Sequence, residues 1–337
     1  MSAPIRIGLV GAGRIGRLHA RLIAFDVPGL VLAGVYDLSE EAARRLGDEL
    51  GVAVAPSASA LMENSETDAI AICTSTDTHV DVLVEAVATG KPVLLEKPVS
   101  LELAEVDRAL TIVERAGMFV QVGFNRRFDP AHASVRDAIA SGEIGDVHLL
   151  RISSRDPGPP SLDYLRVSGG IFLDMTVHDF DMARFLTGSE VAEVSAFGEV
   201  RIDRALEELG DLDTAIVTLR HADRTLTAID NSRRAAYGFD QRVEAFGSAG
   251  MAASLNPLEH TGVVVTEGGT KARALPHFFV ERYVPSYLAQ WAAFERAVRS
   301  GEPPPVTVRD GRAALVAGVA AWRSVREGRP VRVDEIE

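Results

Sequence analysis

The feature that most constrains the fold is a glycine-rich turn, Gly11-Ala12-Gly13-Arg14-Ile15-Gly16. A short apolar run at residues 5–10 precedes the turn and predicts a buried strand. Apolar residues then recur at helical spacing up to residue 23. A strand, a G-x-G-x-x-G turn and a helix in this order form the context in which the pattern binds a dinucleotide. We therefore expect this part of the chain to build a nucleotide-binding α/β domain.

Each position of the turn has a separate role in that expectation. Gly11 permits the tight turn, Gly13 lets the backbone approach the pyrophosphate, and Gly16 lets the helix lie close to the strand. The first turn of the helix offers unpaired N–H groups and a partial positive charge to a phosphate. Arg14 and Ile15 lie in this stretch, so we include them among the cofactor-binding candidates.

The second predicted strand, residues 30–36, indicates which dinucleotide is bound. It ends at Asp37, where the fold needs an acceptor for a ribose hydroxyl. A carboxylate there repels a 2′-phosphate, and the following Leu38 and Ser39 offer no cation to bind one. We therefore expect NAD rather than NADP. Arg14 and Arg44 are the cations that would oppose this preference.

Buried strands and helices alternate as far as residue 123, which predicts a doubly wound parallel sheet of the Rossmann type. Further strands are expected at 69–73, 91–95 and 119–123, and helices at 40–50, 57–63, 79–89 and 101–116. The pattern then changes, so we expect an NAD-binding domain at 1–123 and a substrate-binding domain at 124–337.

Two polar stretches follow strands of the predicted sheet, at the edge where ligands bind in open α/β folds. Thr74, Ser75, Thr76 and His79 follow the strand at 69–73 and are candidate cofactor contacts. The alternative is a cluster of capping side chains for the next helix. Glu96-Lys97-Pro98 follows the strand at 91–95. Its position favours a role in the site over that of an ordinary exposed lysine.

The second half of the chain is strand-rich and ends in two helices. Strands with period-2 or β-branched character are expected at 147–155, 191–201, 213–220, 225–231 and 241–247, and helices to about 141, at 280–299 and at 310–327. Several strands alternate between polar and apolar residues, so one face of the sheet should pack on helices. This predicts an α+β domain built on a large, mostly antiparallel open sheet.

The main helix expected within that domain covers 169–186 and contains acids and one imidazole. Asp174 and His178 are four residues apart, so a continuous helix would present them on one face. A carboxylate beside a histidine suits proton transfer, because histidine titrates near neutrality. The alternative is a buried helix capped by Asp174, with His178 in the core. Asp179 and Asp181 point to other faces, so we expect no metal site.

Composition excludes several functional classes. Lysine and arginine number 35 against 48 acidic residues, and a net charge of −13 argues against nucleic acid and anionic membranes as partners. No apolar run reaches the length of a membrane span, and the first residues do not resemble a secretory leader. The single cysteine, Cys73, ends an apolar run. It is expected to be a buried structural thiol in a reducing cytoplasm.

Together these motifs resemble the glucose–fructose oxidoreductase / inositol dehydrogenase family. The resemblance rests on the glycine turn, Glu96-Lys97-Pro98 and the Asp174…His178 stretch, in this order, and covers nearly the whole chain. Further stretches are most similar to the inositol 2-dehydrogenase branch of the family. They are 123–130, Ser154-Arg155-Asp156-Pro157, 169–172, 178–182 and Tyr237-Gly238-Phe239-Asp240-Gln241-Arg242.

The resemblance implies NAD-dependent oxidation of a ring hydroxyl of myo-inositol to the ketone. Such a reaction needs a base for the hydroxyl proton and a positive charge near the substrate oxygen. His178 is the candidate base, Asp174 orients it or the ring, and Lys97 stabilises the alkoxide. The matching stretches assign Lys97, Arg127, Asp156, Asp174, His178 and Tyr237 to substrate, and Glu96 and Lys97 also to cofactor.

Several of these assignments have structural alternatives. Arg127 could form an ion pair, Asp156 could hold the turn before Pro157, and Tyr237 could serve packing. The resemblance also implies a homotetramer built on the open sheet face of the second domain.

Two further functions stay open at this stage. One is a dehydrogenase of scyllo-inositol, D-chiro-inositol or an aldose, because Phe239 stands where the group usually has tyrosine. The other is an NAD-binding sensor without turnover, which would not need Lys97, Asp174 and His178 together.

Overall fold

The computed structural model describes residues 3–258 and 260–336, which divide into two compact units. Unit 1 contains the chain up to Asn125 together with Ser286–Leu315. Unit 2 contains Arg126–Pro285 and the chain from Val316. The chain therefore returns to unit 1 after most of unit 2 is complete. The division expected at residue 123 did not include this return, and the roles assigned to the two domains stay a prediction.

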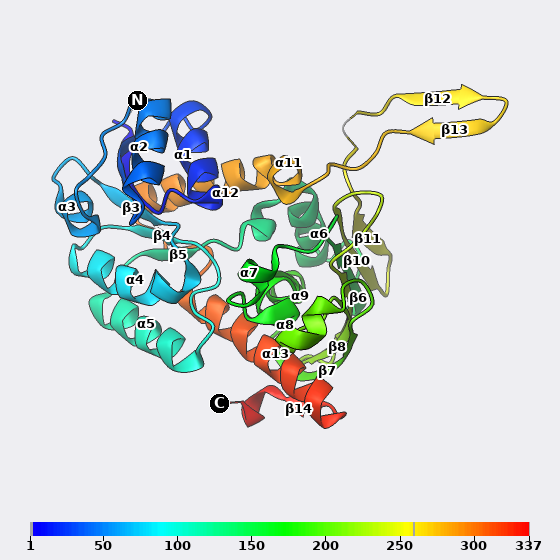
Figure 1. The fold of residues 1–337 in the computed structure, drawn as a ribbon. Coiled ribbons are helices and arrows are strands. Elements are labelled where there is room, and N and C mark those ends of the chain that lie inside the picture. Colours follow the sequence, from blue (N-terminus) through cyan, green and yellow to red (C-terminus); the bar gives the residue numbers. More distant parts are fainter. Residues whose placement is uncertain (1–2, 259, 337) are drawn as a thin grey trace. The chain divides into compact units, whose positions relative to one another are not determined.

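Unit 1 is built on a parallel five-stranded sheet in the order β2-β1-β3-β4-β5. Strands β3, β4 and β5 are labelled in Figure 1. Most of these strands are buried on both faces, as parallel strands covered by helices must be. The expected doubly wound sheet is confirmed. The strands are β1 (Ile5–Val10), β2 (Leu30–Tyr36), β3 (Ala69–Ile72), β4 (Val93–Leu95) and β5 (Val120–Val122).

Helix α2 (Glu40–Leu50) of unit 1 begins and ends at capping residues. Ser39 accepts a hydrogen bond from Ala42 N, and Gly51 ends the same helix in the left-handed conformation. Helix α12 returns from unit 2 and inserts Trp291 and Phe294 into the core beside β1. The helices are α1 (Arg14–Phe25), α2 (Glu40–Leu50), α3 (Ala58–Glu63), α4 (His79–Ala88), α5 (Leu103–Ala116) and α12 (Val284–Ser300).

Unit 2 is built on a seven-stranded sheet in the order β11-β10-β6-β9-β8-β7-β14. Only the β6–β9 pair is parallel among the described pairs of this sheet, so the mostly antiparallel sheet expected from the sequence is confirmed. The strands are β6 (Val147–Arg155), β7 (Val191–Glu199), β8 (Thr214–His221), β9 (Leu226–Ser232), β10 (Asp240–Gly247), β11 (Met251–Ser254) and β14 (Val331–Arg332).

One face of this sheet packs on helices. Helix α6 (Pro130–Ala140) contacts β10 and β11, and α9 (Val177–Thr187) contacts β6. Burial alternates strictly along β8 and β9, which leaves the other face exposed. The helix α13 (Val308–Glu327) begins in unit 1 and ends in unit 2.

The expectation of one continuous helix over 169–186 is wrong. The stretch forms α8 (Gly170–Asp174) and α9, with a break at Met175 and Thr176. Thr176 N donates to Ile171 O five residues earlier, so one extra residue is inserted into the turn. The hydroxyl of Thr176 also contacts Ile171 O and lies 2.6 Å from Asn231 Oδ1 on β9. This break shifts the register between Asp174 and His178.

The sequence also gave no indication of several short elements of unit 2. The largest is a hairpin of β12 (Val263–Thr266) and β13 (Gly269–Ala272), which projects from the rest of the unit (Figure 1). Two short helices are α7 (Leu162–Leu165) and α10 (Ala205–Leu209), whereas α11 (Phe279–Arg282) overlaps the start of the helix expected at 280–299. In the part of the chain that the structure describes, no helix is long and apolar enough to cross a membrane.

Candidate active site

The glycine turn is tightly packed at two of its glycines and open at the third. Gly11 has a φ of 104°, and a Cβ there would lie 2.4 Å from Cys73 O. A Cβ on Gly16 would lie 1.9 Å from Gly11 O. At Gly13 the same atom would meet nothing within 4 Å, so the backbone is open on that side. The turn therefore needs glycine for packing at two positions and leaves space for a ligand at the third.

Asp37 holds the turn as well as lying at the end of β2. Its carboxylate accepts hydrogen bonds from Ala12 N at 2.6 Å and from Ser39 N at 2.7 Å. Arg44, one of the two cations that could attract a 2′-phosphate, is paired with Glu40 at 2.5 Å on an exposed helix face. Arg14 is exposed at the start of α1. This arrangement is compatible with the expected preference for NAD over NADP at Asp37.

The loop after β3 is held by its own polar groups. Thr78 donates to Thr74 Oγ1 at 2.8 Å, and Thr76–Thr78 form a short 3-10 helix. His79 is buried, with Nδ1 2.7 Å from Pro98 O and Nε2 3.2 Å from Thr74 O. In the described part of the chain, neither Ser75 nor Thr78 caps a helix through its side chain, so the capping alternative is wrong. The cofactor contacts expected of Thr74, Ser75, Thr76 and His79 stay predictions.

The Glu96-Lys97-Pro98 turn lies at the carboxyl end of β4, and the Lys97–Pro98 peptide is cis. Glu96 is buried and contacts His19 Nε2 at 2.8 Å and Lys97 N at 3.2 Å. Lys97 itself is half-buried. Cys73 is buried next to this turn, and burial, followed by the charge of Glu96, raises the pKa of its thiol well above the usual value. That fits a structural thiol, whereas a cytoplasmic location stays a prediction.

In unit 2, Asp174 ends α8 and is held by two side chains. Its Oδ1 accepts a hydrogen bond from the Tyr164 hydroxyl at 2.7 Å, and its Oδ2 lies 3.2 Å from Arg233 Nη1. Arg233 is fully buried and also lies 3.6 Å from Asp211 Oδ2. His178 is half-buried in the first turn of α9. Sequence reasoning missed Tyr164 and Arg233, because neither belongs to a local pattern that contains Asp174.

Asp156 belongs to the same electrostatic environment. It directly follows β6, where its N–H donates to Ser232 O and its carbonyl accepts from Ala235 N. Burial raises the pKa of its carboxyl to about 6, Arg233 opposes the rise, and the charge of Asp174 adds to it. A carboxyl that titrates near neutrality fits a site better than a simple turn. The substrate contact expected of Asp156 stays a prediction.

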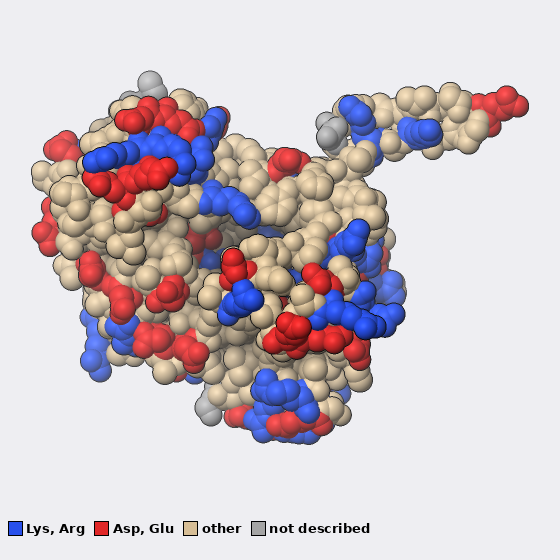
Figure 2. All heavy atoms as spheres, viewed as in Figure 1, with Lys and Arg blue, Asp and Glu red and all other residues tan. Residues whose placement is uncertain are grey.

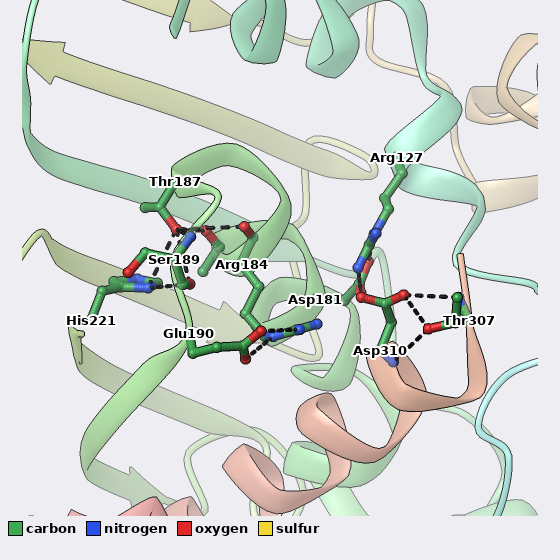
Figure 3. Close-up of polar contacts among 10 residues, drawn as sticks. Arg127, Asp181, Arg184, Thr187, Ser189, Glu190, His221, Thr307 and Asp310 are labelled. Atoms are coloured by element: carbon green, nitrogen blue, oxygen red, sulfur yellow. Dashed lines mark hydrogen bonds and ion pairs between the residues drawn. The ribbon is translucent and has the colours of Figure 1, made fainter. Parts of the chain in front are cut away.

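Two adjacent arginines are paired with acids of α9. Arg127 makes a two-point contact with Asp181, through Nε at 2.8 Å and Nη2 at 2.6 Å (Figure 3). This is the ion pair that the structural alternative expected, and the substrate role of Arg127 stays a prediction. Arg126 contacts Asp179 at 2.8 Å within a buried network that includes Ser154. Asp179 and Asp181 are thus paired with arginines, and their expected role in the fold alone stays a prediction. A third pair, Arg184–Glu190, lies at the end of the same helix (Figure 3).

Tyr237 lies in an exposed turn, where its hydroxyl contacts two charged groups. It donates to Asp240 Oδ2 at 2.7 Å and accepts from Arg155 Nη1 at 2.9 Å. The neighbouring Phe239 is buried, and its ring packs edge-to-face on Tyr283 with centroids 5.9 Å apart. Compared with a tyrosine, Phe239 therefore lacks a hydroxyl at a position that is packed in the interior. A substrate contact of Tyr237 stays a prediction.

Unit 1 thus has the sheet, glycine turn and strand-end acid of a dinucleotide-binding domain, and unit 2 is an α+β domain with a cluster of buried charges. Residues 5–124 match the oxidoreductase family with an NAD-binding Rossmann fold, and residues 132–253 match the GFO/IDH/MocA C-terminal domain. The chain belongs to the GFO/IDH/MocA family of oxidoreductases. Among residues 3–258 and 260–336, no group of three histidines, cysteines or acids is arranged to hold a metal.

Relatives with assigned names are similar over nearly the full length. The chain is 45% identical to a myo-inositol 2-dehydrogenase of Thermotoga maritima, over 98% of this chain and 99% of the relative. A crystal structure of a myo-inositol dehydrogenase from Corynebacterium glutamicum superposes with a TM-score of 0.94 at 40% identity and 98% coverage of both chains. That of a scyllo-inositol dehydrogenase from Lactobacillus casei, with bound NAD(H) and scyllo-inositol, superposes with a TM-score of 0.91 at 28% identity, covering 98% and 99%.

Proposed function

We propose that the protein is an NAD-dependent dehydrogenase that oxidises one ring hydroxyl of myo-inositol to the ketone, 2-keto-myo-inositol. The observation that carries the proposal is the full-length similarity to dehydrogenases named for myo-inositol. The open backbone at Gly13 and the carboxylate of Asp37 support NAD as the cofactor. The bound scyllo-inositol of one structural relative favours other cyclitols as the second candidate substrate class.

The chemistry divides between the cofactor and the side chains. Bound NAD accepts the hydride from the ring carbon. His178 takes the hydroxyl proton on an imidazole nitrogen, and the Lys97 ammonium stabilises the negative charge that develops on the substrate oxygen. Asp174, whose carboxylate is fixed by Tyr164 and Arg233, orients the imidazole or a ring hydroxyl. Arg127, Asp156 and Tyr237 bind the remaining hydroxyls.

An uncharged polyol needs directional acceptors, and Asp156 is suited to this role. Its pKa of about 6 means that most of the carboxyl is ionised at pH 7.5, where it accepts hydrogen bonds from two hydroxyls. Burial makes those hydrogen bonds stronger than they would be in water. Asp156 thus contributes to binding, while His178 carries out the proton transfer.

The decisive experiment measures NADH absorbance with purified protein, NAD and a panel of substrates. We expect turnover with myo-inositol, weaker turnover with scyllo- and D-chiro-inositol, and little with aldoses. Lys97→Ala should lower kcat by about 10²- to 10³-fold, because it removes the charge near the developing alkoxide. A clear preference for an aldose would contradict the substrate. Tight binding of NAD without NADH formation from any polyol would favour the sensor.

We also propose that the protein is a homotetramer whose copies meet through the open face of the unit 2 sheet. Met251, Phe246, Leu149 and Leu226 are neighbours across β11, β10, β6 and β9. Phe197 and Ile216 form a second exposed apolar pair on β7 and β8. Between them, Glu244 and Arg151 are cross-strand partners, so the face can meet a second copy of itself with matched charges.

Light scattering after size exclusion tests this assembly. The wild type should have the mass of four chains, and Phe246→Glu should reduce it, because the variant buries a charge in the interface. Phe25 is an even more exposed aromatic residue, at the end of α1 in unit 1. Phe25→Glu is therefore the control and should leave the mass unchanged. A monomeric wild type would contradict the proposal.

A further inference from the structure

Two buried histidines contact the turn that carries Lys97, and both belong to unit 1. His19 comes from α1, the helix that follows the glycine turn, and His79 from the first turn of α4. His19 Nε2 lies 2.8 Å from Glu96 Oε1, and His79 Nδ1 lies 2.7 Å from Pro98 O. The residues before and after Lys97 are therefore each held by an imidazole from a different helix.

The tautomer of His19 follows from its second partner. Trp291 Nε1 on α12 donates a hydrogen bond to His19 Nδ1 at 2.9 Å. An indole N–H can only donate, so Nδ1 must be an unprotonated acceptor. The ring proton of His19 is then on Nε2 and points to the Glu96 carboxylate. Trp291 is fully buried and packs edge-to-face on the same imidazole, with centroids 5.5 Å apart, which fixes the ring.

Glu96 transmits this contact to the backbone of Lys97. Glu96 Oε1 accepts a hydrogen bond from His19 Nε2, and Oε2 accepts one from Lys97 N at 3.2 Å. Gly123, directly after β5, leaves space for this carboxyl group, because a Cβ there would lie 2.9 Å from the Glu96 carboxyl carbon. Both oxygens of a buried carboxylate are thus used, one by a side chain and one by the peptide that Lys97 shares with Glu96.

His79 holds the other side of the turn. Burial lowers the pKa of its imidazole, so the ring is neutral at pH 7 and carries one N–H. We assign that proton to Nδ1, whose 2.7 Å contact with Pro98 O is shorter than the 3.2 Å contact of Nε2 with Thr74 O. The imidazole therefore ties the first turn of α4 to the carbonyl of Pro98, the residue after Lys97.

We propose that His19 and His79 are positioning residues for Lys97, holding its backbone through the Glu96 carboxylate and the Pro98 carbonyl. This inference rests on the proposed role of Lys97 in the dehydrogenase. Lysine has a long, flexible side chain, so a fixed backbone limits the space that its ammonium explores. A charge that is already in position costs no reorganisation during the reaction. Because His19 lies on α1, the position of Lys97 is also tied to the helix that follows the phosphate-binding turn.

The test compares His19→Met, which cannot donate, with His19→Gln, which keeps an N–H donor near the position of Nε2. His19→Met should lower kcat by about ten- to a hundredfold. The NAD dissociation constant, measured by calorimetry, should change by less than about threefold, because the glycine turn is intact. His19→Gln should recover part of kcat. His79→Met and His79→Gln should behave in the same order.

The matched control is Phe294→Leu, because Phe294 packs on Trp291 in the same core but does not hydrogen-bond to His19. It should lower the melting temperature without the loss of kcat. Glu96→Gln keeps only one acceptor and should lower kcat like His19→Met. The double variant should lose little more than either single one, because both remove one network.

A readout that does not need turnover is the exchange rate of the Lys97 amide hydrogen, measured by mass spectrometry in the presence and absence of NAD. Exchange should be faster in His19→Met and Glu96→Gln than in Phe294→Leu. If His19→Met folds, keeps kcat within about twofold and exchanges at the wild-type rate, the inference is wrong. If the wild type oxidises no polyol, the proposed function fails, and the exchange rates still decide whether these residues hold the turn.

Discussion

The Lys97 turn in unit 1 and the Asp174 cluster in unit 2 hold functional groups by different physical means. Around Lys97 the buried Glu96 carboxylate is held by the His19 imidazole and a backbone N–H, and the His79 imidazole contacts Pro98 O. Around Asp174 the contacts are buried charges, with Arg233 between Asp174 and Asp211. The contacts around Lys97 fix its backbone, whereas the charges around Asp174 also shift the pKa of Asp156. The pH response of the enzyme should therefore come from unit 2.

Charges on the surface contrast with both sites. The acidic and basic side chains visible in Figure 2 are interspersed, and many are paired at exposed positions such as Arg44–Glu40 and Arg332–Asp334. Exposed pairs of this kind contribute little to stability. The pairs that matter energetically are the buried ones, which include Arg233–Asp174, Arg126–Asp179, Arg127–Asp181 and Arg282–Asp129.

The largest effect should come from His178→Ala, which removes the proposed base. We expect kcat to fall by roughly 10²- to 10⁴-fold, because general-base catalysis contributes about that much. The NAD dissociation constant should stay within about twofold, since the glycine turn belongs to unit 1. Steady-state kinetics with myo-inositol and calorimetry with NAD measure the two quantities. A variant with wild-type kcat would remove His178 from its proposed role.

Arg233→Met should have the next largest effect, because it leaves Asp174 and Asp211 buried without their counter-charge. The free energy of unfolding should fall by about 3–5 kcal/mol, as when one partner of a buried pair is removed. The charge of Arg233 also holds down the pKa of Asp156, so that pKa should rise above its present value of about 6. Less Asp156 is then ionised at pH 7, and the acidic limb of kcat/KM should move to higher pH.

Arg233→Lys is the matched control for that prediction. Lysine keeps the positive charge but loses the planar fork of donors. The acidic limb should therefore return toward its wild-type position, while part of the stability stays lost. If Arg233→Met and Arg233→Lys have the same pH profile, the charge of Arg233 does not set the acidic limb, and the proposed contrast between the two sites is wrong.

The sequence predicted what depends on local pattern and missed what depends on distant contacts. Runs and alternations of apolar residues predicted both sheets, and the glycine turn with Asp37 predicted the cofactor-binding end of unit 1. These signals are local, because each lies within one strand, one turn or one helix. No local pattern links Trp291 to His19, since the contact needs α12 to return to unit 1. Arg233 was missed for the same reason. The break at Thr176 depends on Asn231, a residue of a different element.

Substitution of Asp37 should have a smaller effect, which concerns the choice between NAD and NADP. Asp37→Ser should lower the ratio of kcat/KM for NAD to that for NADP by about ten- to a hundredfold, because it removes a charged acceptor and a repulsion. Asp37→Asn keeps an acceptor for Ala12 N or the ribose but not the charge. It therefore separates repulsion of the 2′-phosphate from support of the turn. An unchanged ratio in both variants would contradict the ribose contact.

The smallest effect, and the most direct comparison of stability with function, concerns Asp156. Its folded-state pKa of about 6 lies above the usual value for an aspartate, so the folded state binds more protons than the unfolded chain between about pH 4 and 6. The free energy of unfolding should therefore fall as pH rises through this window. Above pH 6 the folded state bears the full cost of the ionised Asp156 carboxylate. Asp156→Asn removes the ionised form and should raise the free energy of unfolding at pH 7.5 by about 1–3 kcal/mol. At pH 4 the variant and wild type should be nearly equal.

The same substitution should weaken substrate binding, because an amide offers one acceptor oxygen where the carboxylate offers two. We expect the KM for myo-inositol to rise and the melting temperature at pH 7.5 to rise with it, the trade-off seen where a site retains an unfavourable charge. Denaturant titrations at pH 4 and 7.5, combined with steady-state kinetics, measure both sides. If Asp156→Asn is destabilised at pH 7.5 with an unaltered KM, Asp156 serves the turn before Pro157 and the charged region of unit 2 ends at Asp174.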